Sequence, residues 1–194
     1  KFMEYPENTY AKNKQQEIKL YDNNTIEFRN VSFKYPNMEQ YALRNVNVVL
    51  SGGEKVGIVG ENGAGKSTFV KLLLRLYDVS EGEILLNGVN IKNYDYDEYA
   101  KVFSVVPQDY ALFFFGIAEN IAFDKYKEEI DNVKKNLIRV DMLKKVEKLP
   151  YGMDTYLSKW FSKGTDFSGG ETQRIAIARG LFRDAGILVM DEPN

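Results

Sequence analysis

The segment that most restricts how this chain can fold is a glycine-rich stretch of eight residues, Gly60–Ser67, with the sequence GENGAGKS. It directly follows a short apolar run, Val56–Val59, and directly precedes the stretch Phe69–Leu76, whose apolar residues recur at the i, i+3, i+4, i+7 spacing of a helix. We therefore expect a strand buried on both faces at Val56–Val59, then a tight loop, then a helix. This order is the setting in which the pattern G-x-x-x-x-G-K-[ST] binds phosphate groups.

The residue types in this loop suit a polyphosphate. Glycines let backbone N–H groups curve around phosphates without side-chain clashes, and the following helix adds the partial positive charge of its N-terminus. Lys66 is expected to reach the β- and γ-phosphates, and the Ser67 hydroxyl to ligate Mg²⁺. The alternative is a glycine-rich turn with an incidental lysine. The residues expected to contact the ligand are Gly60, Glu61, Asn62, Gly63, Ala64, Gly65, Lys66, Ser67 and Thr68.

An acidic pair, Asp191 and Glu192, ends a second apolar run, Ile187–Met190. Carboxylates that follow a buried strand lie at the carboxyl edge of a sheet, where α/β folds bind their ligands. Asp191 is expected to hold Mg²⁺ through water, and Glu192 to accept a proton from an attacking water molecule. The alternative is that both residues simply cap a strand end, and the phosphate loop in the same chain makes this alternative less favoured.

Residue patterning divides the chain into a strand-rich first part and a helix-rich second part, which indicates an α/β fold. Apolar residues alternate with polar ones from Thr25 to Tyr35, with a slip at Asn30 that indicates a bulge or break, and again from Val46 to Leu50. The other expected elements are strands at 84–86 and 102–106 and helices at 128–149 and 175–182.

Composition excludes several classes of function. The 26 basic and 28 acidic side chains give a formal charge of −2, which argues against a protein that binds nucleic acid by neutralising phosphates. The chain has no cysteine and no histidine, which excludes disulfides, thiolate metal sites and Ser-His or Cys-His nucleophiles. Its longest apolar stretch, Tyr110–Ala118, is far shorter than the roughly 20 residues that span a bilayer. Lys1–Gln16 lacks a signal-peptide pattern, so we expect a cytosolic location.

A third motif, Ser168–Arg174 with the sequence SGGETQR, stands shortly before the strand at Ile187–Met190. The three motifs in this order resemble those of the ATP-binding cassette (ABC) ATPases, and the resemblance runs from about Thr25 to the end of the chain. It implies a P-loop NTPase core with a mainly parallel sheet, an N-terminal antiparallel β subdomain, and an inserted α-helical subdomain at about residues 110–180. It also implies ATP and Mg²⁺ as cofactors.

The resemblance further implies that two cassettes pair head to tail, with each ATP between the phosphate loop of one chain and Ser168–Gly170 of the other. Ser168 looks like an N-cap, and the two glycine amides after it form a second anion site at a helix end. Glu171 stands where the family usually has glutamine, so it is either a nucleotide contact or half of a capping box. We favour the capping box. The residues that the resemblance assigns to the partner's nucleotide are Ser168, Gly169, Gly170 and Glu171.

Two more residues match positions of the family's motifs. Tyr35, in the sequence FKYP, stands where the family has an aromatic ring that stacks on adenine; the alternative is an ordinary tyrosine of the sheet. Gln108 follows an apolar strand and matches a loop glutamine that reaches Mg²⁺ or the water. The resemblance therefore implies catalytic roles for Glu192, Gln108 and Lys66, and Mg²⁺ ligation by Ser67, Gln108 and Asp191.

The aromatic stretch Ala111–Ile117, with the sequence ALFFFGI, has two interpretations that stay open. It lines either a groove for a helix of a membrane domain or the core of the helical subdomain. In the first case, exposed aromatic rings would form a sizeable apolar patch on the chain.

Residues 1–24 are polar and contain Pro6, and they look like the linker that follows the last membrane helix of an exporter-type ABC transporter. We therefore expect residues 25–194 to be an exporter's ATP-binding domain at the cytoplasmic face of the membrane. Its expected partners are a transmembrane domain and a second ATP-binding domain, with no nucleic acid. The alternatives are a soluble ABC ATPase acting on ribosomes or DNA, an importer subunit, and a regulatory module without turnover.

The family's segments after the acidic pair, including a switch histidine, do not occur in this sequence. The domain is therefore expected to be incomplete at its C-terminus, and these 194 residues to bind nucleotide but to hydrolyse it poorly. The transported substrate is chosen by the membrane domain, so this sequence does not indicate it.

Overall fold

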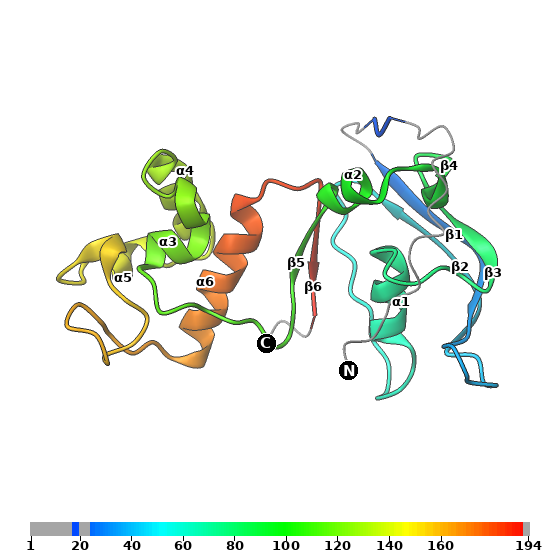
Figure 1. Cartoon of the computed structure of the whole chain (residues 1–194), viewed down its shortest axis with the longest axis horizontal. Helices are drawn as coiled ribbons and strands as arrows, with labels where there is room; N and C mark the ends of the chain where they lie inside the picture. The colour runs from blue at the N-terminus through cyan, green and yellow to red at the C-terminus, as the bar shows by residue number, and fades with distance from the viewer. Residues whose placement is uncertain (1–16, 20–23, 192–194) are drawn as a thin grey trace. The chain divides into compact units, whose positions relative to one another are not determined.

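The computed structural model of the chain describes residues 17–19 and 24–191. The chain divides into two compact units, an N-terminal unit of residues 1–101 and a C-terminal unit of residues 102–194 (Figure 1).

The N-terminal unit contains a four-stranded antiparallel sheet in the order β2-β1-β3-β4. Strand β1 alternates as predicted, with Ile26 and Phe28 buried, and its register slips between Phe28 and Val31, where Asn30 takes a positive φ of 49°. The predicted break at Asn30 is therefore confirmed. The strands are β1 (Thr25–Phe33), β2 (Leu43–Ser51), β3 (Glu81–Leu86) and β4 (Val89–Asn90).

Helix α1 (Lys66–Leu73) covers one face of this sheet (Figure 1). The ring of Phe69 on α1 stacks on Phe28 of β1 with ring centroids 4.2 Å apart, and Leu72 and Leu73 are buried beside it. The helix ends before Leu76, which is 53% exposed, because Arg75 takes a left-handed φ of 54°. The predicted apolar face is therefore one residue too long. A 3-10 helix, Ile91–Asn93, and α2 (Tyr96–Lys101) complete the unit.

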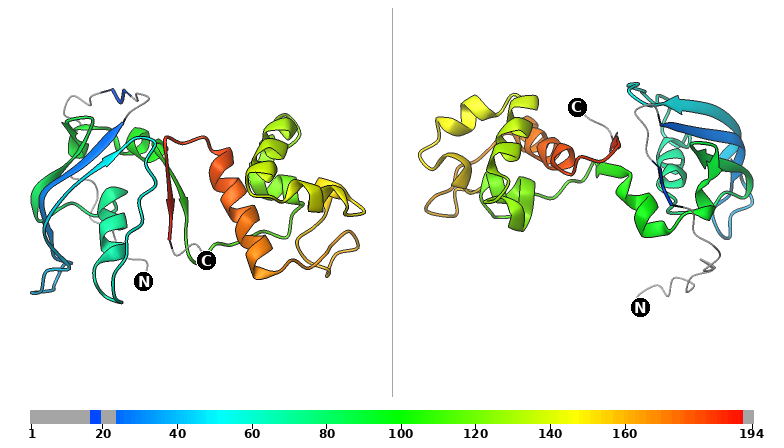
Figure 2. Two further views of the ribbon diagram at one scale, coloured as in Figure 1. Left: turned by 180° about the vertical axis from the view of Figure 1, so that it is seen from behind. Right: turned by 90° about the horizontal axis from the view of Figure 1, so that it is seen from above.

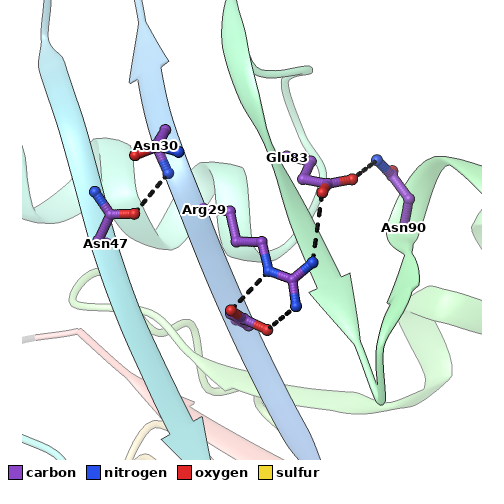
Figure 3. Close-up of polar contacts among 6 residues, drawn as sticks. Arg29, Asn30, Asn47, Glu83 and Asn90 are labelled. Carbon is purple, nitrogen blue, oxygen red and sulfur yellow. Dashed lines mark hydrogen bonds and ion pairs between the residues drawn. The ribbon is translucent and has the colours of Figure 1, made fainter.

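Polar side chains cross the other face of the sheet from strand to strand (Figure 3). Arg29 on β1 donates to both carboxylate oxygens of Glu27, at 2.7 and 2.8 Å, and lies 3.7 Å from the carboxylate of Glu83 on β3. Glu83 in turn accepts from the amide of Asn90 on β4 at 3.1 Å. These charged side chains are at least partly accessible to solvent, so each ion pair adds little to stability. As a cross-strand pair of opposite charge, Arg29 and Glu83 favour the observed register, and the charged side chains keep this face of the sheet hydrated.

The predicted strand at Val56–Val59 is wrong for this structure. The segment is irregular and exposed, and Val59 is 92% accessible to solvent. An apolar run becomes a strand when neighbouring strands satisfy its backbone groups, and no strand of residues 24–191 pairs with this one. Among the strands of the same residues, the parallel pair is formed by β5 (Phe103–Val106) and β6 (Ile187–Met190).

The C-terminal unit places one long helix, α6 (Gly169–Phe182), between the β5–β6 pair and the helices α3 and α4 (Figures 1 and 2). Contact with the sheet is close at Gly180, whose carbonyl accepts from Ser104 Oγ at 2.7 Å. A Cβ at Gly180 would lie 2.8 Å from Val106 Cγ2. The other helices are α3 (Ile117–Ala122), α4 (Ile130–Arg139) and α5 (Leu143–Glu147), with 3-10 turns at Phe123–Lys125 and Gly152–Asp154.

The predicted helix at 128–149 is split into α4 and α5. Asp141 interrupts it with a left-handed φ of 54°. The predicted apolar side is nevertheless right, because Val133 and Leu137 are fully buried against α3 and α6 and Ile130 packs beside them. No helix within residues 17–19 and 24–191 is both long enough and apolar enough to span a bilayer.

Two glycines of the N-terminal unit allow a matched test of packing. Gly82 and Gly88 have almost the same positive φ, 79° and 80°, but a Cβ at Gly82 would lie 2.3 Å from Arg29 O, while a Cβ at Gly88 meets no described atom within 4 Å. Gly88→Ala should cost about 1–2 kcal/mol of unfolding free energy, from backbone conformation alone. Gly82→Ala should cost about 2–5 kcal/mol, because overpacking adds to that strain. Urea denaturation measures both, and equal costs would contradict the tight contact.

Candidate functional site

The glycine-rich loop is fixed at its C-terminal end by Gly65. This residue takes φ 92° at the N-cap of α1, and a Cβ here would lie 2.7 Å from both Ala42 O and Leu43 Cδ2. Both the backbone conformation and the close approach of β2 therefore require glycine. Because the N-cap has no side chain, the amides of the first turn of α1 stay uncovered, as an anion site at a helix N-terminus requires.

Lys66 lies across the mouth of this loop. Its ammonium donates to the carbonyl of Gly60 at 2.8 Å and to the carbonyl of Glu61 at 3.0 Å. A turn closed by the bond from Ala64 N to Glu61 O at 3.1 Å shapes the rest of the loop. The structure thus gathers amides and one cation at a single exposed loop, which suits a polyanion.

The two hydroxyl residues after Lys66 differ in their surroundings. Ser67 is exposed at the start of α1, whereas Thr68 is buried and its Oγ1 lies 3.0 Å from the Tyr35 hydroxyl. Tyr35 is half-buried, with its ring edge-on to Phe33 at 5.0 Å and to Tyr77 at 5.3 Å. The structure therefore places Tyr35 beside the helix that carries the phosphate loop. Its stacking on adenine stays a prediction.

Gln108 and Asp191 follow neighbouring parallel strands. Val106 of β5 pairs with Met190 of β6, and Asp191 N donates to Val106 O at 3.1 Å. Both residues therefore follow the carboxyl ends of neighbouring parallel strands, the edge predicted for Asp191, and their roles at a nucleotide stay predictions. Glu192 lies outside the described residues.

The predicted metal ligands fit Mg²⁺ by their chemistry. A serine hydroxyl (Ser67), an amide oxygen (Gln108) and a carboxylate (Asp191) are all hard oxygen donors, and Mg²⁺ usually binds one or two carboxylates together with phosphates and water. Ser67 belongs to the N-terminal unit, and the other two belong to the C-terminal unit.

The SGGETQR motif forms the start of α6, and the predicted capping box is confirmed. Ser168 Oγ accepts from Glu171 N at 3.4 Å, and Glu171 Oε2 accepts from Ser168 N at 3.0 Å. The other carboxylate oxygen of Glu171 pairs with the Lys145 ammonium of α5. The Lys145 hydrogen bond, followed by the Ser168 amide, holds the pKa of Glu171 below its usual value.

Nothing in the described residues requires glycine at positions 169 and 170, at the start of α6. Neither has a positive φ, and a Cβ at either position would meet no atom of the described residues within 4 Å. This contrasts with Gly65, where both conformation and packing demand glycine.

A network that sequence reasoning missed fixes the aromatic stretch Ala111–Ile117. Asn120 is fully buried, and its amide donates to the carbonyls of Phe113, Phe115 and Gly116 at 2.9–3.2 Å. Arg179 of α6 donates to Ala111 O, Asn120 O and Asn120 Oδ1 at 2.7–2.9 Å. No local pattern signals this network, because its members are separated by up to 68 residues in sequence.

Arg179 also lies between two rings of the same region. Its guanidinium carbon is 5.4 Å from the centroid of Phe113 and 5.4 Å from that of Phe123. Burial lowers the pKa of this guanidinium. Phe113, Phe114 and Phe115 remain 44%, 66% and 41% exposed, whereas Ile117 is fully buried. The core interpretation therefore holds for Ile117 but not for the three phenylalanines.

Comparison with known proteins places the chain in a family. The family model described as ABC transporter matches residues 43–194, so the chain belongs to the ABC transporter family. A solved structure, "Structure of a bacterial Atm1-family ABC exporter with ATP bound", superimposes with a TM-score of 0.77 at 33% identity, covering 92% of this chain and 32% of that one. The mixed α/β fold of the ABC ATPases, with its antiparallel β part and helices, is therefore confirmed.

Two curated relatives are particularly similar. The chain is 42% identical over 175 residues to the subtilin transport ATP-binding protein SpaT of Bacillus subtilis. It is 43% identical over 171 residues to the ATP-dependent lipid A-core flippase of Haemophilus influenzae (strain 86-028NP). These alignments cover 88% and 86% of this chain but 28% of each relative, so the chain spans little more than a quarter of their length.

The charge of Glu171 gives a pH prediction. Because its pKa is lowered in the folded state, its ionised form stabilises the fold above about pH 4.5, and this contribution is lost as the pH falls through the lowered value. Glu171→Gln should therefore cost less than about 1 kcal/mol near neutral pH, and the cost should shrink below pH 4.5. Chemical denaturation across pH 3–8, with Glu128→Gln as an exposed control, measures the difference. A cost independent of pH would show that the charge is not involved.

Proposed function

We propose that this chain is the ATP-binding and ATP-hydrolysing domain of an ABC exporter. In this proposal the phosphate loop of one copy holds ATP with Mg²⁺, and Ser168–Gly170 of a second, head-to-tail copy completes the site. The relatives support it by their names, which describe subtilin transport, ATP-dependent flipping and an exporter with ATP bound. These names favour an exporter over an importer subunit or a soluble ATPase.

The observation that carries the shared site is the pair Gly169 and Gly170. Glycine in a helix interior costs about 1 kcal/mol relative to alanine, and among the described residues glycine at 169 and 170 relieves neither strain nor crowding. A bare backbone at the first turn of α6 leaves amides open to close approach from outside. A second copy's nucleotide is the ligand that suits such an anion site, because the helix N-terminus favours negative charge.

Each of the predicted catalytic and metal-binding residues then has a role in hydrolysis. The Lys66 ammonium stabilises charge on the β- and γ-phosphates, and Ser67, Gln108 and Asp191 would hold Mg²⁺, which when bound neutralises phosphate charge. Gln108 orients the attacking water and Glu192 accepts its proton. The water oxygen forms a bond to the γ-phosphorus while the bond from that phosphorus to the ADP oxygen breaks.

The transmembrane partner is proposed to bind an aromatic face of the C-terminal unit. We define this face by Phe113, Phe114, Phe115, Trp160 and Phe161, of which Trp160 is 93% and Phe114 66% exposed. Phe114 and Phe161 already contact each other, with centroids 6.0 Å apart. Exposed apolar patches of this kind mark interaction sites. Docking here would place the chain at the cytoplasmic side of a membrane, with residues 1–24 as the linker and 25–194 as the ATP-binding domain.

Alanine at the two glycines tests the shared site. Gly169→Ala and Gly170→Ala should leave the unfolding free energy unchanged or raise it by up to about 1 kcal/mol. They should nevertheless reduce ATP-dependent self-association at least about tenfold, because the added methyl groups stand where the partner's phosphates approach. Sedimentation with and without Mg-ATP, in a Glu192→Gln background that slows hydrolysis, measures the association.

Gly180→Ala is the matched control on the same helix. Its Cβ would lie 2.8 Å from Val106 Cγ2, so this variant should lose stability. Unimpaired ATP-dependent association of the Gly169 and Gly170 variants would contradict the proposed site.

A further inference from the structure

A hydrogen-bonded triangle joins the segment after β5 to the start of α6. The Tyr110 hydroxyl lies 3.1 Å from Gly169 O and 3.1 Å from Thr172 Oγ1, and Thr172 Oγ1 donates to Gly169 O at 2.8 Å. Tyr110 and Thr172 carry one hydroxyl proton each. The Tyr110 hydroxyl donates its proton to Gly169 O, as Thr172 Oγ1 does, so the two hydroxyls converge on one carbonyl oxygen.

The position of Tyr110 makes this link short and direct. It is two residues after Gln108, and the next residue, Ala111, is held through its carbonyl by Arg179 of the same helix. The segment 110–111 is therefore tied to α6 at two adjacent positions. A displacement of Gln108 has one intervening residue, Asp109, to absorb it before it reaches the first turn of α6.

The first turn of α6 is also held by Lys145 through Glu171. The Lys145 ammonium also lies 5.5 Å from the centroid of Phe167. The turn that carries Gly169 and Gly170 is thus held both by Lys145 of α5 and by Tyr110. Removing either link frees that turn to reorient without unfolding the unit, because the buried core around α6 does not include these side chains.

We propose that Tyr110 is a positioning residue, which orients Ser168–Gly170 for the partner copy's nucleotide by fixing that turn to the Gln108 segment. This proposal rests on the proposed function, since it assumes the shared site. It ties a residue expected to act on the chain's own nucleotide to residues that act on the partner's. Tyr110 itself touches neither nucleotide.

The test compares the 194-residue chain carrying Glu192→Gln alone with the same chain carrying Glu192→Gln and Tyr110→Phe, and it measures three properties. The melting temperature should stay the same. The affinity of the chain for a fluorescent ATP analogue, measured at concentrations too low for association, should stay the same within twofold. The ATP concentration needed for half-maximal association should rise about two- to tenfold, the effect of one lost hydrogen bond. A role confined to stability would instead change the melting temperature and the association together.

Variants of Thr172 show whether the triangle is responsible. Thr172→Val should weaken ATP-dependent association as Tyr110→Phe does. The double variant should associate no more weakly than either single variant. Thr172→Ser should associate normally, because serine keeps the hydroxyl. Tyr151→Phe, which removes the same group from an exposed tyrosine of the same unit, is the control and should have no effect.

Normal association of the Tyr110→Phe chain, or additive losses in the double variant, would overturn the positioning role and leave the proposed function intact. If the chain with Tyr110 in place forms no ATP-dependent dimer, the proposed function fails, and this inference fails with it.

Discussion

The proposed nucleotide site depends on two helix N-termini at which some backbone amides have no side-chain cap: those of the first turn of α1, and those of Gly169 and Gly170 in α6. At α1 the N-cap is Gly65, required by its positive φ and by the close approach of Ala42. At α6 the N-cap is Ser168, followed by two glycines that nothing in the described chain requires. A helix N-terminus attracts anions through its free amides and its dipole, and water cannot be displaced from it without a replacement ligand. One helix end in each unit thus offers the same chemistry.

The rest of the C-terminal unit keeps the second helix end in place. The capping box, Lys145 and Tyr110 hold its first turn, and Arg179 with Asn120 holds the segment that leads away from β5. The same segment exposes the phenylalanines of the aromatic face. The SGGETQR motif, the Gln108 segment and the proposed docking face are therefore all connected to one helix, α6, and we propose α6 as the element that links nucleotide binding to the transmembrane partner.

Local features were predictable from the sequence, and long-range ones were not. The structure confirms the break at Asn30, the capping box at Ser168 and the strands that precede Gln108 and Asp191, because each of these depends on neighbouring residues. The prediction of a strand at Val56–Val59 was wrong, because strand formation depends on neighbouring strands that local sequence does not specify. The predicted helix at 128–149 is two helices, because Asp141 takes a left-handed φ. The links Tyr110–Gly169 and Asn120–Arg179 each join residues 59 apart, which no periodicity reveals.

The most direct test of the shared site mixes two defective copies. Lys66→Ala removes the cation of the phosphate loop, and Ser168→Arg blocks the start of α6, so neither variant alone should trap ATP in a Glu192→Gln dimer. An equimolar mixture should trap about a quarter of the ATP that the unmutated pair traps, because half of the dimers then contain one intact site. No recovery in a mixture that still dimerises, or full trapping by either variant alone, would contradict a site built from two copies.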